Sequence, residues 1–371
     1  MIAAPLLALA ALTLPALLAC GPAPKGAGDG NTDSGAIDTG AGPPARGPSP
    51  YSLDEVLRLT DAQALGTHNS YHRRSDRIVD PSHDYDHAPL DVQLEEQGVR
   101  QFELDLHLHA SLGWQVFHLP GDVDEGTTCL ALADCLGTIL AWSDQNPWHL
   151  PLTIWLEPKD EDLDWAIPEL EPFVDRHDEL ERAILDVIPA ARIFTPDELR
   201  GAHPDLPTAL AAEGWPTLGA LRGRFLFAML DSDKHRAAYL AGAPALEGRL
   251  MFVDADTPAD PFAATFKINN AVADAALVAE VAAAGMLVTS NIDGAGSDEA
   301  EAQASLDGSL AAGAHLLSTD YPAPVPERAY FAQIPGGTPA RCSPLTAPAE
   351  CTPNEIEDLA RARALAAEAS R

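Results

Sequence analysis

Four short stretches of the chain carry residues whose types and spacing could do chemistry: GTHNSYH (66–72), QFELDLH (101–107), VFHLPG (116–121) and WLEPKD (155–160). Each is joined to an apolar, strand-like run and presents a His, an Asn or a carboxylate at or near its end. Alternate side chains of a strand point to opposite faces, so Glu103 and Asp105 point to the same side. Two such carboxylates repel each other, and burying an unpaired charge costs several kcal/mol. We therefore expect a cation between them.

A hard divalent cation is the simplest candidate for that charge. Calcium takes oxygen ligands from carboxylates, amide carbonyls and water, and magnesium is the alternative ion. The metal ligands that we predict come from three separate strand ends and are Asn69, Glu103, Asp105 and Glu157. His68 and His118 flank these ligands, and imidazoles can transfer protons near neutral pH. This inventory contains no obvious Ser or Cys nucleophile.

Two lysines are candidate contacts for a substrate phosphate. Glu157 and Lys159 lie two residues apart and share one face of their strand. Lys159 could contact a phosphate oxygen that the metal does not reach, and the alternative is an ion pair between Glu157 and Lys159. Further candidates stand at the ends of later strand-like runs, and these are Lys267, Asn291, Asp293 and Asp320.

The elements that must position these residues alternate between strand-like and helical runs. The segment AQALGTHN (62–69) predicts the first strand, and helices are expected over 88–97 and near 178–187. A short SLG turn predicts a hairpin that returns His118 to the end of the strands where the other candidate residues stand. Strand and helix alternation is typical of parallel α/β barrels, whose functional residues stand at the C-terminal strand ends. We predict a (β/α)8 barrel of TIM type, regular or distorted, over 51–335.

The four motifs, taken in order, resemble the catalytic half of the phosphatidylinositol-specific phospholipase C-like phosphodiesterases, and most closely their calcium-dependent bacterial and fungal branch. The clear resemblance covers about residues 51–160, and weaker agreement continues to 321. It implies that calcium lowers the pKa of the inositol 2-hydroxyl and stabilises charge on phosphorus. It also implies that His118 protonates the diacylglycerol oxygen, while His68 acts as a base or phosphate contact. The run TSNID (289–293) departs from the family, whose penultimate strand tends to end in an Arg-containing segment.

The first functional hypothesis is a calcium-dependent phosphodiesterase that cleaves phosphatidylinositol or a related glycolipid to diacylglycerol and an inositol phosphate, cyclic or hydrolysed. The substrate's own hydroxyl then replaces the absent protein nucleophile. A second hypothesis is a glycerophosphodiester phosphodiesterase or a sphingomyelinase D-like barrel, although the HRG opening of the former reads HNS here. A third is a surface binding protein that keeps the barrel without turnover.

Charge and the amino-terminal segment indicate where the protein works. A formal net charge of −33 over 371 residues argues against nucleic acid and against polybasic docking on anionic lipid. Residues 1–19 are an apolar run ending in LLAC, which resembles a lipoprotein signal peptide with Cys20 as the acylated residue, although no Lys or Arg precedes it. Residues 20–50 have the composition of a disordered tether. We expect an exported monomer, lipid-anchored to the bacterial cell envelope or secreted.

The remaining signals are cysteines, a histidine-bearing loop and the two ends of the folded region. Pairing by proximity gives disulfides Cys129–Cys135 and Cys342–Cys351, although four cysteines permit three connectivities and a zinc site is the rival.

Ser52 and Glu55 fit a helix capping box, and the 336–371 tail predicts a helix over 354–369 capped by Thr352. The polar loop 71–90 is either solvated or in contact with substrate through His72, Arg73, Arg74, His83 and His87.

Overall fold

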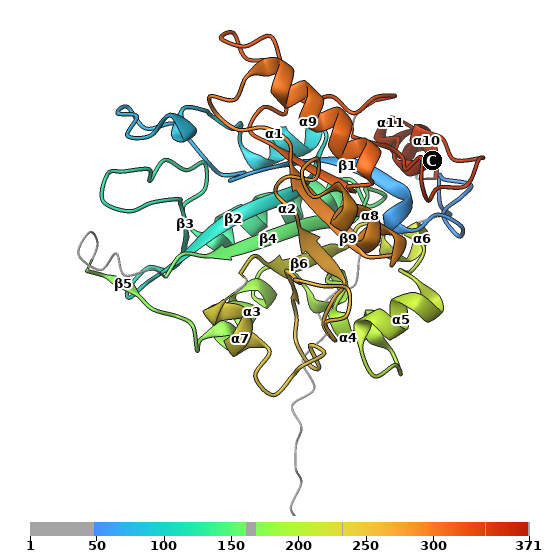
Figure 1. The fold of residues 1–371 in the computed structure, drawn as a ribbon, viewed down its shortest axis with the longest axis horizontal. Helices are drawn as coiled ribbons and strands as arrows, with labels where there is room; N and C mark the ends of the chain where they lie inside the picture. The colour runs from blue at the N-terminus through green and yellow to red at the C-terminus, as the bar shows by residue number, and fades with distance from the viewer. Residues whose placement is uncertain (1–47, 161–167, 232, 338, 370–371) are drawn as a thin grey trace, which may run out of the picture. The chain divides into compact units, whose positions relative to one another are not determined.

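Eight parallel strands form the frame of the computed structural model, which describes residues 48–160, 168–231, 233–337 and 339–369 (Figure 1). Their spatial order is β7-β6-β4-β2-β1-β10-β9-β8. The strands are β1 (Ala62–Thr67), β2 (Val99–His109), β4 (Leu152–Pro158), β6 (Phe225–Met229), β7 (Phe252–Val253), β8 (Thr265–Lys267), β9 (Leu287–Asn291) and β10 (Leu316–Thr319). A parallel bridge between Asp254 and Thr265 joins the last strand to the first. The predicted barrel is therefore confirmed.

Helices alternate with these strands along the chain, as the sequence pattern predicts. They are α1 (Leu90–Glu95), α2 (Leu132–Gln145), α3 (His177–Leu185), α4 (Pro196–Arg200), α5 (Leu206–Glu213), α6 (Leu218–Leu221), α7 (Lys234–Tyr239), α8 (Ala275–Ala283), α9 (Glu299–Ala312), α10 (Pro353–Ile356) and α11 (Leu359–Ala369). The barrel is distorted between β7 and β8, because the fully described segment 254–264 contains no helix. None of the described helices is long and apolar enough to cross a bilayer.

The predicted hairpin is present and extends the longest strand. β3 (Gly113–Val116) runs antiparallel to β2, with Leu106 opposite Val116 and His109 opposite Gly113. Gly113 has a φ of +74°, a backbone conformation that glycine adopts without strain. β5 (Leu170–Glu171) pairs with the same end of β2. The chain after β3 is thereby returned to the mouth of the barrel.

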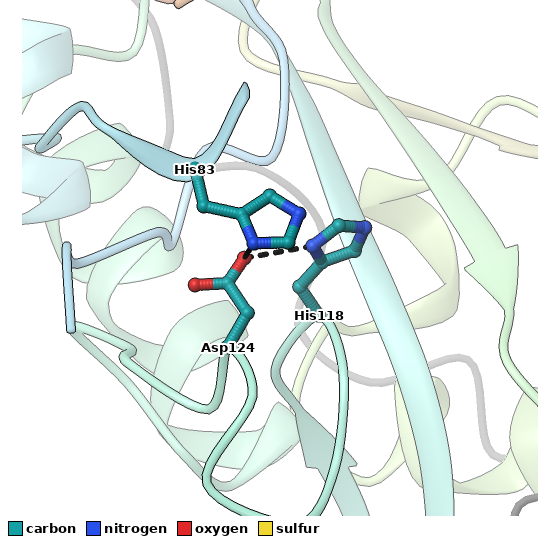
Figure 2. Close-up of side chains that lie close together, drawn as sticks. All are labelled: His83, His118 and Asp124. Atoms are coloured by element: carbon teal, nitrogen blue, oxygen red, sulfur yellow. Dashed lines mark hydrogen bonds and ion pairs between the residues drawn. The ribbon is translucent and has the colours of Figure 1, made fainter. Parts of the chain in front are cut away.

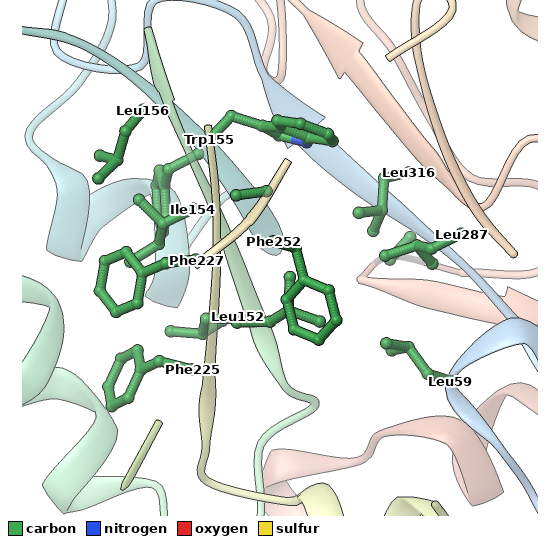
Figure 3. Close-up of a cluster of buried hydrophobic side chains, with 14 of the residues drawn as sticks. Leu59, Leu152, Ile154, Trp155, Leu156, Phe225, Phe227, Phe252, Leu287 and Leu316 are labelled. Atoms are coloured by element: carbon green, nitrogen blue, oxygen red, sulfur yellow. The ribbon is translucent and has the colours of Figure 1, made fainter. Parts of the chain in front are cut away.

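Apolar side chains fill the barrel and the space beneath its helices (Figure 3). Strands of a parallel barrel are buried on both faces, which explains their nearly continuous apolar runs. Trp155 is fully buried, and its Nε1 donates a hydrogen bond of 3.0 Å to Thr289 Oγ1 on β9. β4 and β9 are not neighbours, so Trp155 must point into the barrel. Glu103 lies beside Trp155 in register and therefore faces inward as well.

The two ends of the folded region correct two predictions. Residues 52–56 form turns instead of a helix, and the Glu355 carboxylate accepts hydrogen bonds from the backbone N–H groups of Ser52 and Leu53. The tail helix is split into α10 and α11, because Glu357 turns inward to bind Arg100. Thr352 precedes α10 without a side-chain capping bond. Each of these contacts joins residues far apart in sequence, which local patterns do not report.

Both disulfides expected from proximity are present, Cys129–Cys135 and Cys342–Cys351. The second belongs to β11 (Ala340–Cys342), which pairs antiparallel with the start of β1. The tail is thus attached to the barrel through its sheet. The predicted signal peptide, the lipidation site Cys20 and the tether up to residue 47 lie outside the described residues.

Candidate functional site

A polar cavity of about 410 Å³ lies at the C-terminal ends of the strands. It is lined by His68, Glu103, Glu157, Pro158, Leu230, Asp231, Asp254, Lys267, Asn269 and Asn291. These residues come from separate segments that the barrel brings together, as parallel strands of this fold do. Five of the candidate residues named from the sequence therefore line one cavity: His68, Glu103, Glu157, Lys267 and Asn291.

Three carboxylates form the centre of the site. Glu103, Asp105 and Glu157 each offer an oxygen, and the three oxygens lie within 4.8 Å of one another. The strand register explains this proximity, because Asp105 on β2 is directly opposite Glu157 on β4. Burial, and then the charge of Glu157, raises the pKa of Asp105 to about 8. The cluster is therefore short of positive charge, as the sequence predicts.

Two lysines supply part of that charge. Lys267 Nζ is hydrogen-bonded to Glu103, while Lys159 Nζ lies 2.5 Å from Glu157 Oε1 and 3.3 Å from Asp105 Oδ2. Burial lowers the pKa of Lys159, but the charges of Asp105 and Glu157 outweigh it and raise the pKa above its usual value. The ion pair considered for Lys159 is thus present. A contact between either lysine and a substrate phosphate stays a prediction.

The oxygen atoms near this cluster fit a calcium ion. Four buried oxygens at this cluster accept no hydrogen bond within the described part of the chain: Asn69 Oδ1, Asp105 Oδ1, Asp105 Oδ2 and Asn291 Oδ1. Asn69 has a φ of +41°, in the left-handed region that Asn tolerates better than most residues. Ser70 Oγ accepts the N–H of Glu103 at 2.8 Å and so joins the Asn69 turn to β2. Unpartnered amide and carboxylate oxygens are the donor set that calcium prefers.

His68 is oriented by a carboxylate at the end of β10. Its Nδ1 lies 2.9 Å from Asp320 Oδ1, and its Nε2 lies 3.7 Å from Glu103 Oε1. Burial acts to lower the pKa of His68, but Asp320 and Glu103 outweigh it and raise the pKa to about 9. Asp320 is itself fixed by the N–H of Ala295, which donates to Oδ2 at 2.8 Å. Sequence reasoning named Asp320 as a candidate but did not assign it to His68.

His118 has a corresponding partner in Asp124, which sequence reasoning missed. His118 Nδ1 lies 2.8 Å from Asp124 Oδ2 (Figure 2). Burial lowers the pKa of His118, partly offset by the hydrogen bond to Asp124. Burial acts to raise the pKa of Asp124, but hydrogen bonds from His118 and His72 outweigh it and lower the pKa to about 2. The motif loop contains Asp122, Asp124 and Glu125, so spacing alone could not identify the one that faces His118.

A buried histidine, His107, supports the His118 segment. His107 Nε2 lies 3.1 Å from the Phe117 carbonyl oxygen and 3.2 Å from that of His118, and its ring stacks on Phe117. Lys159 acts electrostatically on both Asp105 and His118, lowering the pKa of each. In the hairpin, Val116 on β3 lies opposite Leu106 on β2, the residue after Asp105, so His118 lies at the same end of the barrel as the carboxylate cluster, although it does not line the cavity described above.

The sequence model of one protein family, described as Phosphoinositide phospholipase C, Ca2+-dependent, matches residues 57–113 and 109–344. No curated protein matches the chain at a significant level.

Solved structures with a similar fold include a Ca2+-dependent phosphatidylinositol-specific phospholipase C from Streptomyces antibioticus. It is 21% identical, with 72% of this chain and 96% of that chain covered and a TM-score of 0.52. A calcium-dependent phosphoinositol-specific phospholipase C from Pseudomonas sp. is 17% identical, with 80% and 100% covered and a TM-score of 0.55. Its myo-inositol complex is 18% identical, with 78% and 96% covered and a TM-score of 0.55. At these identities the likeness concerns the fold.

Proposed function

We propose that this chain, which belongs to the Ca2+-dependent phosphoinositide phospholipase C family, cleaves phosphatidylinositol or a related inositol glycolipid to diacylglycerol and an inositol phosphate. Members of this family are phosphodiesterases, and so is this chain. One observation carries the assignment of the site: two imidazoles, each bound to its own carboxylate, share the mouth of the barrel with three clustered carboxylates. Acid, base and a cation-binding group are what the reaction of a phosphodiester requires.

Asn69, Glu103, Asp105 and Glu157 are the residues that would hold calcium. The bound ion supplies positive charge that neutralises the phosphate and makes the neighbouring sugar hydroxyl more acidic. Lys159 and Lys267 stay close enough to the carboxylates to balance their charge when substrate is absent. Lys159, at the edge of the cluster and 18% exposed, is the lysine better placed to turn toward a phosphate oxygen.

The two histidines divide the proton transfers between them. Asp320 holds the Nδ1–H of His68, and a cation bound at Glu103 would offset the negative charge that keeps Nε2 protonated, so that Nε2 would accept the proton of the attacking inositol hydroxyl. Asp124 holds the Nδ1–H of His118, which leaves Nε2–H to protonate the diacylglycerol oxygen as the bond to phosphorus breaks. Each aspartate stabilises the imidazolium form of its histidine and fixes the ring's orientation. The assignment of base to His68 and acid to His118 follows the family resemblance.

The experiment that tests this function is a phospholipid panel with and without calcium, with the products identified by phosphorus NMR. Phosphatidylinositol should give an inositol phosphate, and chelation of calcium should abolish its formation. Release of choline phosphates, or of glycerol phosphate from glycerophosphodiesters, would contradict the proposal in favour of the other barrel phosphodiesterases. Lipid binding without any product at saturating calcium would indicate a binding protein.

The cellular setting is part of the same proposal. The chain is exported and anchored to the cell envelope by acylation of Cys20, where it acts as a monomer on membrane lipid. The lipobox-like run before Cys20 supports the anchor, and the two disulfides support an oxidising compartment. Substitution of Cys20 by Ser should move the protein from the membrane fraction to the soluble fraction. Unchanged membrane retention of that variant would contradict the anchor.

A further inference from the structure

A second cluster of metal-ligating groups lies beside His118, apart from the three carboxylates. Asp124 Oδ2 is approached by two imidazoles, at 2.8 Å by His118 Nδ1 and at 3.5 Å by His83 Nδ1 (Figure 2). One ligand atom from each residue lies within 4.8 Å of the other two. His83 comes from the loop before α1, whereas His118 and Asp124 follow β3. Two loops therefore converge on one small space.

His83 is the feature that calls for a ligand in this space. The residue is 9% exposed, and its Nδ1 is buried without a hydrogen-bond partner in the described chain. Leaving a buried polar nitrogen unpaired costs about 1–3 kcal/mol. Local bonds fix the backbone that carries the ring, because the His83 N–H donates to the Asp80 carbonyl at 3.0 Å and Asp80 Oδ1 accepts from Ser82 N at 2.9 Å. The nitrogen thus faces Asp124 without bonding to it.

His72 completes the surroundings of the cluster. Its Nε2 lies 2.9 Å from Asp124 Oδ1, and its Nδ1 lies 3.1 Å from the Tyr85 carbonyl oxygen. His72 therefore bonds to Oδ1 of Asp124, whereas His83 and His118 face Oδ2. An outer hydrogen bond of this kind orients a carboxylate ligand and leaves its other oxygen for a metal.

We propose that His83, His118 and Asp124 form a second metal site, for Zn2+ or a similar transition-metal ion, and that its occupation switches off the enzyme. Two imidazole nitrogens and one carboxylate oxygen are ligands typical of zinc, with the remaining position left to water. Calcium prefers oxygen ligands alone. The two clusters therefore select different ions, with calcium at Glu103, Asp105 and Glu157 and zinc at His83, His118 and Asp124.

The inhibitory effect follows from the atom that zinc would bind. Zinc on His118 Nδ1 takes the place of the proton now shared with Asp124, and that proton is released to solvent. The ring then cannot carry protons on both nitrogens, which is the form that donates to a leaving group. This part of the inference rests on the proposed role of His118, whereas the binding of zinc does not.

The test is a zinc titration of the full chain in excess calcium, with binding measured by calorimetry. One zinc ion should bind per chain, with release of protons, and activity should fall in proportion to zinc occupancy. Co2+ used as a probe should give visible absorption bands that indicate nitrogen ligands. A zinc-selective chelator should restore activity. These binding measurements need no substrate, so they remain informative if the proposed lipid activity fails.

His83→Gln is the informative variant, because it removes a ligand while leaving His118 and Asp124 in place. Zinc affinity should fall by more than the roughly 10–100-fold that loss of an outer hydrogen-bond partner of a metal ligand costs, and activity without zinc should equal that of the wild type. His203→Gln is the matched control: His203 Nε2 also lies 2.8 Å from a carboxylate, that of Glu213, but among the described residues it belongs to no three-ligand cluster. This control should bind zinc normally.

Three results would overturn the inference. Displacement of the bound zinc by calcium would place it in the carboxylate cluster. Wild-type zinc affinity and wild-type cobalt bands in a folded His83→Gln variant would exclude the site. Zinc bound at His83 without loss of activity would overturn its inhibitory role.

Discussion

Lys267, at the end of β8, is hydrogen-bonded to Glu103 in β2, the strand on the opposite side of the barrel. Both side chains are almost completely buried. Burial acts to raise the pKa of Glu103, but the charges of Lys267 and then His68 outweigh it and lower the pKa. The proposed calcium ion and Lys267 would serve the same carboxylate, so we expect stability and metal binding to be interdependent.

The variant Lys267→Met should expose this interdependence. Without calcium, loss of the buried partner of Glu103 should lower the free energy of unfolding by about 3–5 kcal/mol. Calcium should stabilise the variant more than the wild type, because the ion supplies the charge that the lysine no longer provides. Thermal unfolding with calcium and with chelator measures both effects. Lys234→Met, which alters a lysine that is half-exposed and paired with Asp160, is the control. An equal effect of calcium on all three proteins would contradict this interpretation.

The roles of the two histidines can be separated by the leaving group. General acid or base catalysis contributes about 10²–10⁴-fold to a rate, so His68→Ala and His118→Ala should both lose about that much on the natural lipid. A substrate with a nitrophenol leaving group needs no protonation. On that substrate His118→Ala should recover most of its rate, and His68→Ala should not. Recovery by His68→Ala instead would reverse the two assignments.

Asp320→Asn and Asp124→Asn test the positioning of the rings. Each variant keeps the size of the side chain but removes the negative charge that orients its histidine. We expect lower kcat with little change in KM, and a smaller loss than in the corresponding histidine variant. Asp124→Asn should behave like His118→Ala and regain most of its rate on the nitrophenol substrate. A rise in KM alone would indicate that these aspartates bind substrate.

Buried histidines should make the protein less stable in mild acid. Burial, as the largest cause, lowers the pKa of five of them from 6.5 to about 3–4: His87, His107, His149, His177 and His315. Because the folded pKa lies below the unfolded one, the unfolded chain binds more protons between these values. Stability is therefore lost as pH falls from 6.5 toward 4, by up to about 1.4 kcal/mol per pH unit for each histidine.

His315→Asn isolates one of these contributions. His315 Nδ1 accepts the Val288 N–H at 3.0 Å, and the Asn oxygen can take over that role without titrating. Urea unfolding at a series of pH values should show that the unfolding free energy falls less steeply with pH in this variant. The slope should differ from that of the wild type by the contribution of at most one proton, about 1.4 kcal/mol per pH unit. His203→Gln, which changes a partly exposed histidine, should leave the slope unchanged. An unaltered slope in His315→Asn would show that this histidine is protonated in the folded state.

The buried pair Arg100–Glu357 attaches the carboxyl-terminal tail to the barrel. Arg100 Nε donates to Glu357 Oε1 at 2.9 Å, and the Leu150 N–H donates to Oε2 at 2.6 Å. Glu357→Gln should leave Arg100 unpaired and cost about 3–5 kcal/mol of unfolding free energy. Glu368→Gln, an exposed change in α11, should have almost no effect. A loss below about 1 kcal/mol for Glu357→Gln would show that the pair is not structurally important.

Local patterns in the sequence determined the strands of the barrel and the carboxylates they carry. Period-2 alternation is a property of any strand, so Glu103 and Asp105 necessarily share a face once 101–107 is extended. The hairpin and both disulfides followed from short separations along the chain. In each case the interacting residues are close enough in sequence for spacing to limit their geometry.

The tertiary structure alone decided which distant partner each side chain meets. Asp320 reaches His68 across 252 positions of sequence, and Lys267 reaches Glu103 across 164. Glu357 interrupts a run that otherwise favours one helix, because a buried ion pair with Arg100 outweighs helix propensity. The sequence did not distinguish Asp124 from the other two acids of its loop, whereas the fold places Asp124 against three histidines. Such choices depend on how distant segments of the chain pack together, which no short segment encodes.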